Sequence, residues 1–511
     1  MASGSRKSLV SLAAQSVGYG LGIFGRQVVV YMTLPLFTNR MPQAEYGLVS
    51  FSVAVMAFVN TLSNAGLHGA IFRFYHDSDD AHARRQVLGS SLFMLALLAI
   101  LPATGFVAFA DVLARSFLAS ADYALVIRVT SALLVVDTLV NYGYILLRIQ
   151  VRPVATSISN LWIVAAQMGI ALVFVYVCDW GAIGYLVGLL LGEMTGLMLL
   201  VFLTRRLISI RVSRQTIGML LRYGLPLLPA SLSMWALHLA DRILIGALVG
   251  LDQVAVYEVG YKMGGLVGLA VAPFGAAWPP FAFAAMRGPG APRIYRDVLT
   301  SLFIVSVFIM LGLIAFQLEI LRLLAPATYM PALSVVGWVA LVQVFQASYL
   351  VLSIGPKISK RTSDLALVAV LAATIYLILN IVLIPRIGIQ GAAIATLIGY
   401  GLLAFGSYFI GQRSYPFPLD WIRLIKLAFA AVGAYGLIAA VSRLGFSGWG
   451  YYLGKLGAWF SFPLICLLIG VVTISQLRGL WQSAFHMVQA RALQMKERGR
   501  PGSVPHPWQA D

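Results

Sequence analysis

The chain has 511 residues, of which 60% are hydrophobic and only 11% are charged, and its formal net charge is +18. A soluble protein is nearer half apolar and a quarter charged, so these few charges cannot cover the surfaces of several soluble domains. The composition excludes a soluble protein and predicts an all-α polytopic membrane protein. The positive charge does not indicate nucleic-acid binding, because Lys and Arg cluster between apolar stretches.

Apolar stretches long enough to cross a bilayer follow one another along the chain. A transmembrane helix needs about 20 mostly apolar residues. The first stretch, after Arg6 and Lys7, is too long for a signal peptide, so we interpret it as an uncleaved helix. We expect about fourteen spans, at 12–38, 46–71, 87–110, 122–147, 154–178, 182–203, 225–249, 253–282, 298–318, 331–354, 364–385, 388–410, 423–443 and 455–476.

The loops between these spans alternate in charge. One set carries most of the cations, for example Arg84, Arg85, Arg205 and Arg206, whereas the other set carries few. Cytoplasmic loops are the ones enriched in Lys and Arg, so both termini are predicted to lie in the cytoplasm. An odd number of spans would break this alternation, which favours fourteen.

The chain contains an internal duplication. DWGAIGYLVGLLLG (179–192) aligns with RIGIQGAAIATLIG (386–399), and Tyr46 and Tyr257 match at a nearly equal offset. A repeat after six helices gives two lobes of the same orientation, between which a transporter holds its substrate. We expect six-helix lobes at 1–215 and 216–415, two further helices in 416–478, and a basic cytoplasmic tail at 479–511 that begins with an interfacial helix.

Several charged side chains fall inside the predicted spans. A charge at the bilayer centre costs roughly 2.5–3.5 kcal/mol, so such groups pair with one another or face a wet cavity. Glu258 and Lys262 have the i,i+4 spacing of a self-neutralising pair. The others are Arg26, Asp137, Glu193, His238, Asp241 and Arg242.

Arg26 has no acid at helical spacing in its own span, and we expect it to face a cavity. A guanidinium binds phosphate bidentately, which predicts an anionic headgroup as its ligand. Asn60 and Asn64 either line a sugar path or hold helices together. Asp137, Glu193 and Asp241 are candidates for ion coupling. The sequence contains no nucleotide-binding P-loop or hydrolase motif, and we expect no cofactor and no catalytic residue.

Three stretches resemble a known family. They are VVVYMTLPLFTNRMPQAEYGLVSF (28–51), NAGLHGAIFRFY (64–75) and ADRILIGALVGLDQVAVYEVGYKMG (240–264), the last with an Asp-Arg pair and a downstream Tyr. They are similar to polysaccharide-export and O-antigen (Wzx-type) flippases of the multidrug/oligosaccharidyl-lipid/polysaccharide exporter superfamily.

The resemblance implies that the chain moves an undecaprenyl-pyrophosphate-linked oligosaccharide across the bacterial inner membrane, by alternating access, for cell-surface polysaccharide or lipopolysaccharide biosynthesis. It implies a cationic central cavity, to which we assign Arg26, Arg242 and Lys262, with Asn60 and Asn64 as further substrate contacts. Membrane lipid and the lipid-linked oligosaccharide are the expected ligands. A polysaccharide polymerase or glycosyltransferases are the expected protein partners.

Three other functions are alternatives to this one. A multidrug/cation antiporter of the same superfamily would need an acidic cavity, which the unpaired Arg26 disfavours. A flippase for the peptidoglycan lipid precursor would share the cationic cavity, and the sequence does not separate the two substrates. A membrane-embedded polymerase would need a large outer loop for its catalytic groups, and every predicted outer loop is short.

Overall fold

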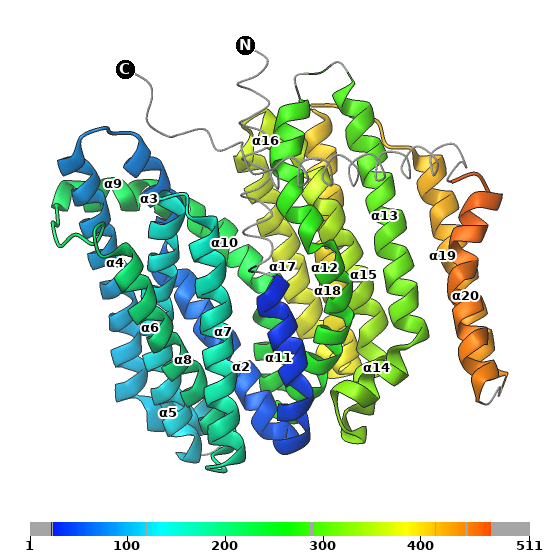
Figure 1. Cartoon of the computed structure of the whole chain (residues 1–511), viewed down its shortest axis with the longest axis horizontal. Coiled ribbons are helices and arrows are strands. Elements are labelled where there is room, and N and C mark those ends of the chain that lie inside the picture. Colours follow the sequence, from blue (N-terminus) through cyan, green and yellow to red (C-terminus); the bar gives the residue numbers. More distant parts are fainter. Residues whose placement is uncertain are drawn as a thin grey trace, which may run out of the picture. The chain divides into compact units, whose positions relative to one another are not determined.

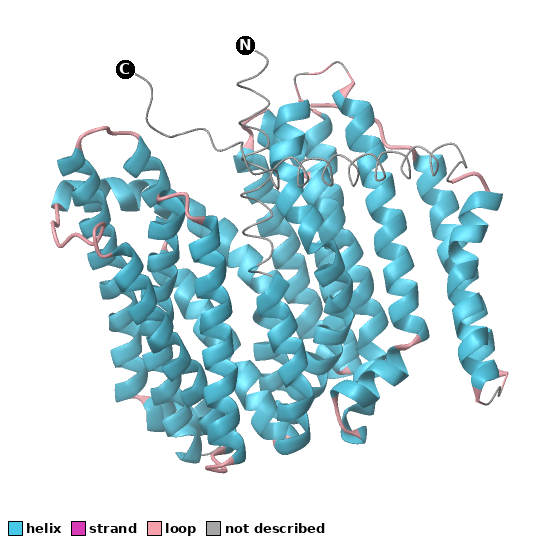
Figure 2. Ribbon diagram, in the orientation of Figure 1, coloured by secondary structure: helices cyan, strands magenta, loops and turns pink. Residues whose placement is uncertain are grey.

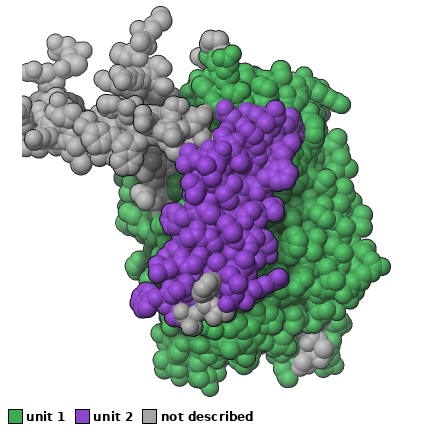
Figure 3. All heavy atoms as spheres, turned by 90° about the vertical axis from the view of Figure 1, so that its right-hand side faces the viewer, with its two compact units in different colours: residues 1–419 green, residues 420–511 purple. Residues whose placement is uncertain are grey.

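A computed structural model shows a bundle of helices (Figures 1 and 2). It describes residues 22, 24–118, 121–286, 288, 290–413, 415–444 and 448–471, and these residues contain no strand. The chain divides into two compact units, Met1–Leu419 and Asp420–Asp511, which Figure 3 colours separately. The all-α membrane fold predicted from the sequence is confirmed.

The first unit begins with helices from the predicted first lobe. Residues 24–40 are helical, and the part of the first predicted span before them lies largely outside the described residues. The helices that follow are α2 (Gln43–Asn64), α3 (Leu67–His76), α4 (Ala81–Ala108), α5 (Ala110–Leu118), α6 (Ala124–Ile149), α7 (Pro153–Tyr176) and α8 (Gly181–Thr204), with a short 3₁₀ turn η1 (Ala121–Tyr123).

A short helix, α9 (Arg214–Gly224), leads into the second lobe. The elements of that lobe are η2 (Leu225–Leu227), α10 (Leu228–Trp235), η3 (Ala236–Ala240), α11 (Asp241–Leu248), α12 (Leu251–Ala285), α13 (Ala291–Ala315), α14 (Gln317–Leu324), η4 (Ala327–Ala332), α15 (Leu333–Leu352), α16 (Ile354–Ile358), α17 (Thr362–Ile387) and α18 (Ile389–Gln412). In Figure 1, α3, α9 and α16 lie at one end of this unit and α5 and α14 at the other.

The second unit, purple in Figure 3, contains α19 (Trp421–Arg443) and α20 (Trp449–Leu468). The Asp420 carboxylate caps α19 by accepting a hydrogen bond from the backbone N–H of Arg423 at 3.1 Å. These helices correspond to the thirteenth and fourteenth predicted spans. The predicted interfacial helix in the tail at 479–511 lies outside the described residues.

Twelve helices of the described part of the chain are long and apolar enough to cross a membrane. They match the second to sixth and eighth to fourteenth predicted spans. The first span is described only in part. The seventh, predicted over 225–249, is helical without interruption from Leu225 to Leu248, but its helix type changes along its length. It consists of η2, α10, the single π-helical turn η3 and α11. The total of fourteen spans therefore stays a prediction.

Local sequence explains the breaks and starts of the helices. The second span is interrupted at Ala65 and Gly66, which both have positive φ (46° and 71°) and separate α2 from α3. Asp80 begins α4 by accepting hydrogen bonds from the backbone N–H groups of His82 and Ala83. These hydrogen bonds also lower the pKa of the Asp80 carboxyl in this loop.

The two lobes repeat one packing scheme. In the first lobe α7 packs on α8, α6 on α8, and α4 on α6. In the second lobe the equivalent pairs, α17 with α18, α15 with α18, and α13 with α15, pack in the same way. The duplication predicted from the sequence is therefore present in the helix packing.

Matched glycines make matched contacts at the α7–α8 and α17–α18 interfaces. Gly181 is the first residue of α8 and Gly388 directly precedes α18, and their φ angles are +52° and +59°. A Cβ at Gly192 would lie 2.5 Å from the Cα of Gln167 on α7, and a Cβ at the equivalent Gly399 would lie 3.1 Å from the Cβ of Tyr376 on α17. Small residues at these positions let the helix pairs approach closely.

The two lobes meet at the end that the loop charges predict to face outwards. The Thr38 hydroxyl donates to the Leu324 carbonyl at 2.9 Å, and the Gln43 amide donates to the Thr328 carbonyl at 2.9 Å. A Cβ at Gly47 on α2 would overlap the carbonyl oxygen of Leu251 on α12. At this end the lobes are closed against each other.

Replacing Gly47 by Ala is expected to lower the thermal unfolding midpoint of the purified protein. The new methyl group would force α2 away from α12, and overpacking of this kind costs about 1–3 kcal/mol. Gly169→Ala on α7 is the matched control, because no atom lies within 4 Å of its new Cβ. Equal midpoints for the two variants would show that the close approach of α2 and α12 does not stabilise the fold.

Candidate functional site

A cavity of about 460 Å³ lies between the lobes in the first unit. Helix 24–40 contributes one wall, with Gln27 and Tyr31 one turn apart, and η3, α11, α12 and α15 contribute the rest. The lining residues are Gln27, Tyr31, His238, Arg242, Glu258, Tyr261, Lys262, Gly265, Gly268, Leu269, Val271, Ala272, Gln343, Gln346, Ala347 and Leu350. This size and mixed lining suit a small polar ligand or part of a larger one.

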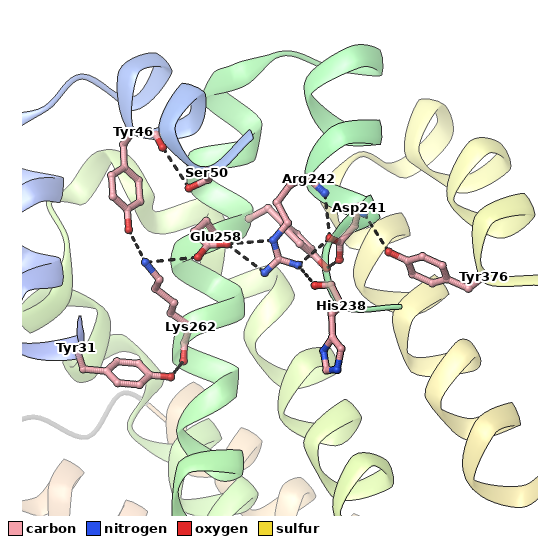
Figure 4. A network of polar contacts seen from close by, with 10 residues as sticks. Tyr31, Tyr46, Ser50, His238, Asp241, Arg242, Glu258, Lys262 and Tyr376 are labelled. Carbon is pink, nitrogen blue, oxygen red and sulfur yellow. Dashed lines mark hydrogen bonds and ion pairs between the residues drawn. The ribbon is translucent and has the colours of Figure 1, made fainter. Parts of the chain in front are cut away.

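Arg242 is the centre of a charged network on one wall of the cavity (Figure 4). Its Nη1 lies 2.7 Å from Oδ1 of Asp241, and its Nε and Nη2 both lie 3.1 Å from Oε2 of Glu258. Nη1 also donates to the His238 carbonyl at 2.8 Å, and the guanidinium carbon lies 4.0 Å from the centre of the Tyr261 ring. The Arg242 side chain is 4% exposed, so it is almost fully enclosed by these partners.

Lys262 extends the network towards the first lobe. Its ammonium lies 3.4 Å from Oε1 of Glu258 and donates to the Tyr46 hydroxyl at 2.7 Å. Tyr31 on helix 24–40 donates to the Lys262 carbonyl at 2.8 Å. The predicted i,i+4 pair of Glu258 and Lys262 is present, and Lys262 also joins the two lobes.

Tyrosines hold the buried acid of the network in place. The Tyr257 hydroxyl donates to Oδ2 of Asp241 at 2.6 Å, and the backbone N–H of Asp241 donates to the Tyr376 hydroxyl at 3.0 Å. His238 is within hydrogen-bond distance of the Tyr400 hydroxyl at 2.9 Å. The π-helical turn η3 directly precedes Asp241, and such turns re-aim the side chains around them at functional sites.

This network contains two carboxylates, Asp241 and Glu258, and two cations, Arg242 and Lys262. Their formal charges sum to zero, and each cation has its acid within 3.4 Å. An ion pair that is already satisfied by its own partners has little attraction left for an incoming anion. This wall of the cavity is therefore polar but electrically neutral.

A second polar cluster lies inside the first lobe. Asn60 on α2 and Asn141 on α6 both donate to Oδ2 of Asp137, the latter at 3.0 Å. Gln167 on α7 donates to Oε1 of Glu193 on α8 at 3.0 Å. The two carboxyl groups are close enough to interact with each other and with Arg26. Oε2 of Glu193 is buried, and no donor among the described residues reaches it.

The structure brings together only some of the residues singled out in the sequence. Arg242, Lys262 and Asp241 form one network, whereas Arg26, Asn60, Asp137 and Glu193 belong to the other cluster. Asn64 joins neither, because its side chain is hydrogen-bonded to His68 one turn away at 3.0 Å. Arg26 is exposed and forms no ion pair with a described residue, yet it is adjacent in sequence to Gln27 of the cavity wall.

The cavity lining includes polar residues that the sequence did not single out, among them two glutamines. Gln343 and Gln346 lie three residues apart in the apolar span α15 and line the cavity. A pair of amides at helical spacing in an otherwise apolar helix marks one polar face, and this is the signal that could have identified them. Within the part of the chain that the structure describes, no three His, Cys, Asp or Glu side chains are grouped as in a metal site.

Comparison with known proteins identifies the fold. A family model described as "Polysaccharide biosynthesis protein" matches residues 41–272, which confirms the resemblance over this part of the chain. A structure of "Lipid II flippase MurJ, inward closed conformation" superimposes with a TM-score of 0.67 over 89% of this chain and 98% of that chain, at 14% identity. The chain has the fold of the MOP-superfamily transporters.

Two further structures have this fold. An "inward-facing conformation of a multidrug resistance MATE family transporter of the MOP superfamily" gives a TM-score of 0.61 at 17% identity, over 76% of this chain and 97% of that one. A MOP-superfamily transporter from Pyrococcus furiosus, described as having a binding pocket of reverse polarity, gives 0.58 at 15% identity, over 79% and 95%. No curated protein sequence matches this chain. At these identities the structures establish the fold but not the substrate.

Replacing Arg242 by Leu is expected to destabilise the MOP-fold protein by roughly 3–5 kcal/mol, because Asp241 and Glu258 lose a buried partner. The double variant Asp241→Asn/Arg242→Leu should recover part of this loss, since Glu258 and Lys262 still balance each other. Thermal unfolding of the purified protein measures both effects.

Arg128→Leu is the control, because it removes only an exposed ion pair with Asp111 and such pairs contribute about 0–1 kcal/mol. A double variant less stable than Arg242→Leu would contradict the view that charge balance holds this network together.

Proposed function

We propose that the protein is a flippase that moves an undecaprenyl-pyrophosphate-linked oligosaccharide from the cytoplasmic to the outer leaflet of the bacterial inner membrane. The observation that carries the proposal is Arg26, an exposed cation without an ion pair among the described residues, next to the wall of an inter-lobe cavity in a MOP fold. The match to a polysaccharide biosynthesis family and the likeness to a lipid II flippase support it.

A polar cavity between two lobes suits the transfer of a charged, sugar-bearing headgroup across a membrane. A pyrophosphate and a sugar chain cannot cross hydrocarbon unaided, because each buried polar group without a partner costs several kcal/mol. A polar cavity between two lobes offers those partners, while the polyprenyl tail stays in lipid. A guanidinium such as that of Arg26 is suited to the pyrophosphate, which it binds through paired hydrogen bonds. The step breaks no covalent bond, so the site needs no catalytic residue.

In this proposal the residues assigned to the substrate from the sequence have different roles. Asn60 is engaged by Asp137 and Asn64 by His68, so both position other side chains instead of contacting substrate. Arg242 and Lys262, assigned to the anion from the sequence, are neutralised by Asp241 and Glu258 and act in the framework of the cavity. Arg26 is then the substrate's cationic contact. Both termini face the cytoplasm, as the loop charges predict.

Ion coupling is assigned to Asp137 and Glu193. A proton shared between these two interacting carboxyl groups would avoid placing two like charges side by side. That proton would also supply a hydrogen bond to the unsatisfied Oε2 of Glu193. Asp241 is a poorer candidate, because Arg242 and Tyr257 already occupy both of its oxygens.

The same carboxyl pair favours a second candidate function, export of a cationic drug by a MATE-type antiporter. A pair of acids inside the first lobe could attract a cation or exchange it for a proton, and MATE transporters share this fold. The two functions differ in the sign of the charge that the substrate carries and in the effect of losing Arg26.

Replacing Arg26 by Ala is expected to leave lipid-linked oligosaccharide on the cytoplasmic leaflet, as in cells that lack the gene. The guanidinium is the exposed cation that offsets the pyrophosphate charge, and its loss should lower flipping at least about tenfold, equivalent to about 1.4 kcal/mol. The measurement is the sidedness of the lipid-linked sugar at matched protein levels.

Arg128→Ala, which alters an exposed ion pair, is the control and should flip normally. Normal sidedness in the null strain together with altered sensitivity to cationic drugs would replace the flippase by the antiporter. Lipid-linked units that accumulate outside while the polymer is missing would indicate a polymerase instead.

Asp137→Asn and Glu193→Gln are each expected to uncouple transport from the proton gradient. An amide cannot release the shared proton, so flipping in reconstituted vesicles should become insensitive to an imposed pH difference. Asp111→Asn, on an exposed helix, is the matched control. Unchanged gradient dependence in both carboxyl variants would remove the coupling role from this pair.

A further inference from the structure

The cavity has a feature that neither charge pairing nor helix packing explains. Three glutamine side chains, Gln27, Gln343 and Gln346, line it, and none forms a hydrogen bond with another described residue. Gln343 is only 8% exposed and lines the cavity, and its amide atoms are not among the fully buried atoms of the described residues, so the amide faces the space of the cavity. An amide that faces a cavity without a protein partner is available to hydrogen-bond a ligand there.

The surrounding backbone makes room for this amide. Gly268 on α12 faces Gln343, and a Cβ there would collide with Oε1 of the glutamine. Gly265 lies one turn earlier on α12 and faces Tyr31. A Cβ at Gly265 would lie 3.0 Å from the Tyr31 hydroxyl oxygen. Both glycines line the cavity and keep that side of it open. The position of Gln343 therefore depends on a small residue opposite it.

The charge of the cavity limits what these amides bind. Asp241, Arg242, Glu258 and Lys262 sum to zero and satisfy one another, so this part of the site does not select an ion. An amide offers two N–H donors and a carbonyl acceptor at once. A group of such amides suits a neutral ligand rich in both donors and acceptors, as the hydroxyl and acetamido groups of a sugar are.

We infer that Gln343, Gln346 and Gln27 form a glycan subsite, separate from the contact that Arg26 makes with the pyrophosphate. The inference rests on the proposed function and assigns the two chemically different parts of the headgroup to two places. Gln27 and Arg26 are consecutive on helix 24–40, so the sugar attached to the pyrophosphate reaches the cavity as the phosphates reach Arg26. Gln343, the most enclosed of the three amides, is the main determinant of selectivity.

Two probes separate the subsites. One is undecaprenyl pyrophosphate without sugar, and the other is the lipid-linked oligosaccharide pool extracted from cells that lack the gene. Binding of each to the purified full-length protein is measured by native mass spectrometry. The wild-type protein should bind the sugar-bearing pool more tightly than the bare lipid.

Gln343→Leu should weaken binding of the sugar-bearing pool about tenfold, because one or two hydrogen bonds are lost in an enclosed site. The same substitution should change binding of the bare lipid less than about twofold. Gln346→Leu should show the same selectivity to a smaller extent. Gly268→Ala tests the site without altering the amide, and it should reproduce the selective loss by displacing Gln343. Gln215→Leu, exposed on α9, is the matched control.

The outcomes distinguish the two proposals. Arg26→Gln should weaken both probes equally, which tests the pyrophosphate contact and not the glycan subsite. A Gln343→Leu variant that weakens both probes equally, or neither, overturns the glycan subsite. So does a wild-type protein that binds the bare lipid as tightly as the sugar-bearing pool. A wild-type protein that binds neither probe overturns the proposed function and the subsite with it.

Discussion

The fold depends on how charge is kept inside an apolar bundle. Arg242 is enclosed by Asp241, Glu258 and the Tyr261 ring, and the network carries no net charge. A lone cation there would be too costly in a low-dielectric interior, and each acid without Arg242 would be equally unfavourable. Because its members come from α11 and α12, and Lys262 reaches Tyr46 on α2, the same interactions that neutralise the charge also fix helices of both lobes.

The duplicated helix packing determines where buried polar side chains lie in each lobe. Glycine contacts at equivalent positions hold α7 against α8 and α17 against α18. At these interfaces Gln167 lies against Gly192 and donates to Glu193, and Tyr376 lies against Gly399 and accepts from the backbone N–H of Asp241. The two lobes therefore use one scaffold for two different purposes, an acid pair near Arg26 in one and a neutral network in the other.

Much of this could be predicted from the sequence, because it depends on periodic or local signals. The lengths of the apolar stretches predicted the twelve spans that the structure describes, and the aligned glycines predicted the repeat. The i,i+4 spacing predicted the ion pair of Glu258 and Lys262. Contacts between helices distant in sequence could not be predicted. Nothing in the spacing indicates that Asn60 binds Asp137 or that Arg242 reaches Glu258 sixteen residues away. The π turn before Asp241 was not predicted either, because the sequence of the seventh span indicates only a helix and not its hydrogen-bonding pattern.

The sequence treats Arg26, Arg242 and Lys262 as equivalent, since each is a cation in an apolar span. The structure separates them by their partners. Two are saturated by acids that lie within 3.4 Å, and one is exposed without an ion pair among the described residues. The attraction for an anion follows the uncompensated charge and not the number of cations. In the proposed function the pyrophosphate is therefore placed at Arg26, the exposed cation that forms no ion pair with a described residue, and hydrogen bonds select the ligand in the neutral part of the cavity.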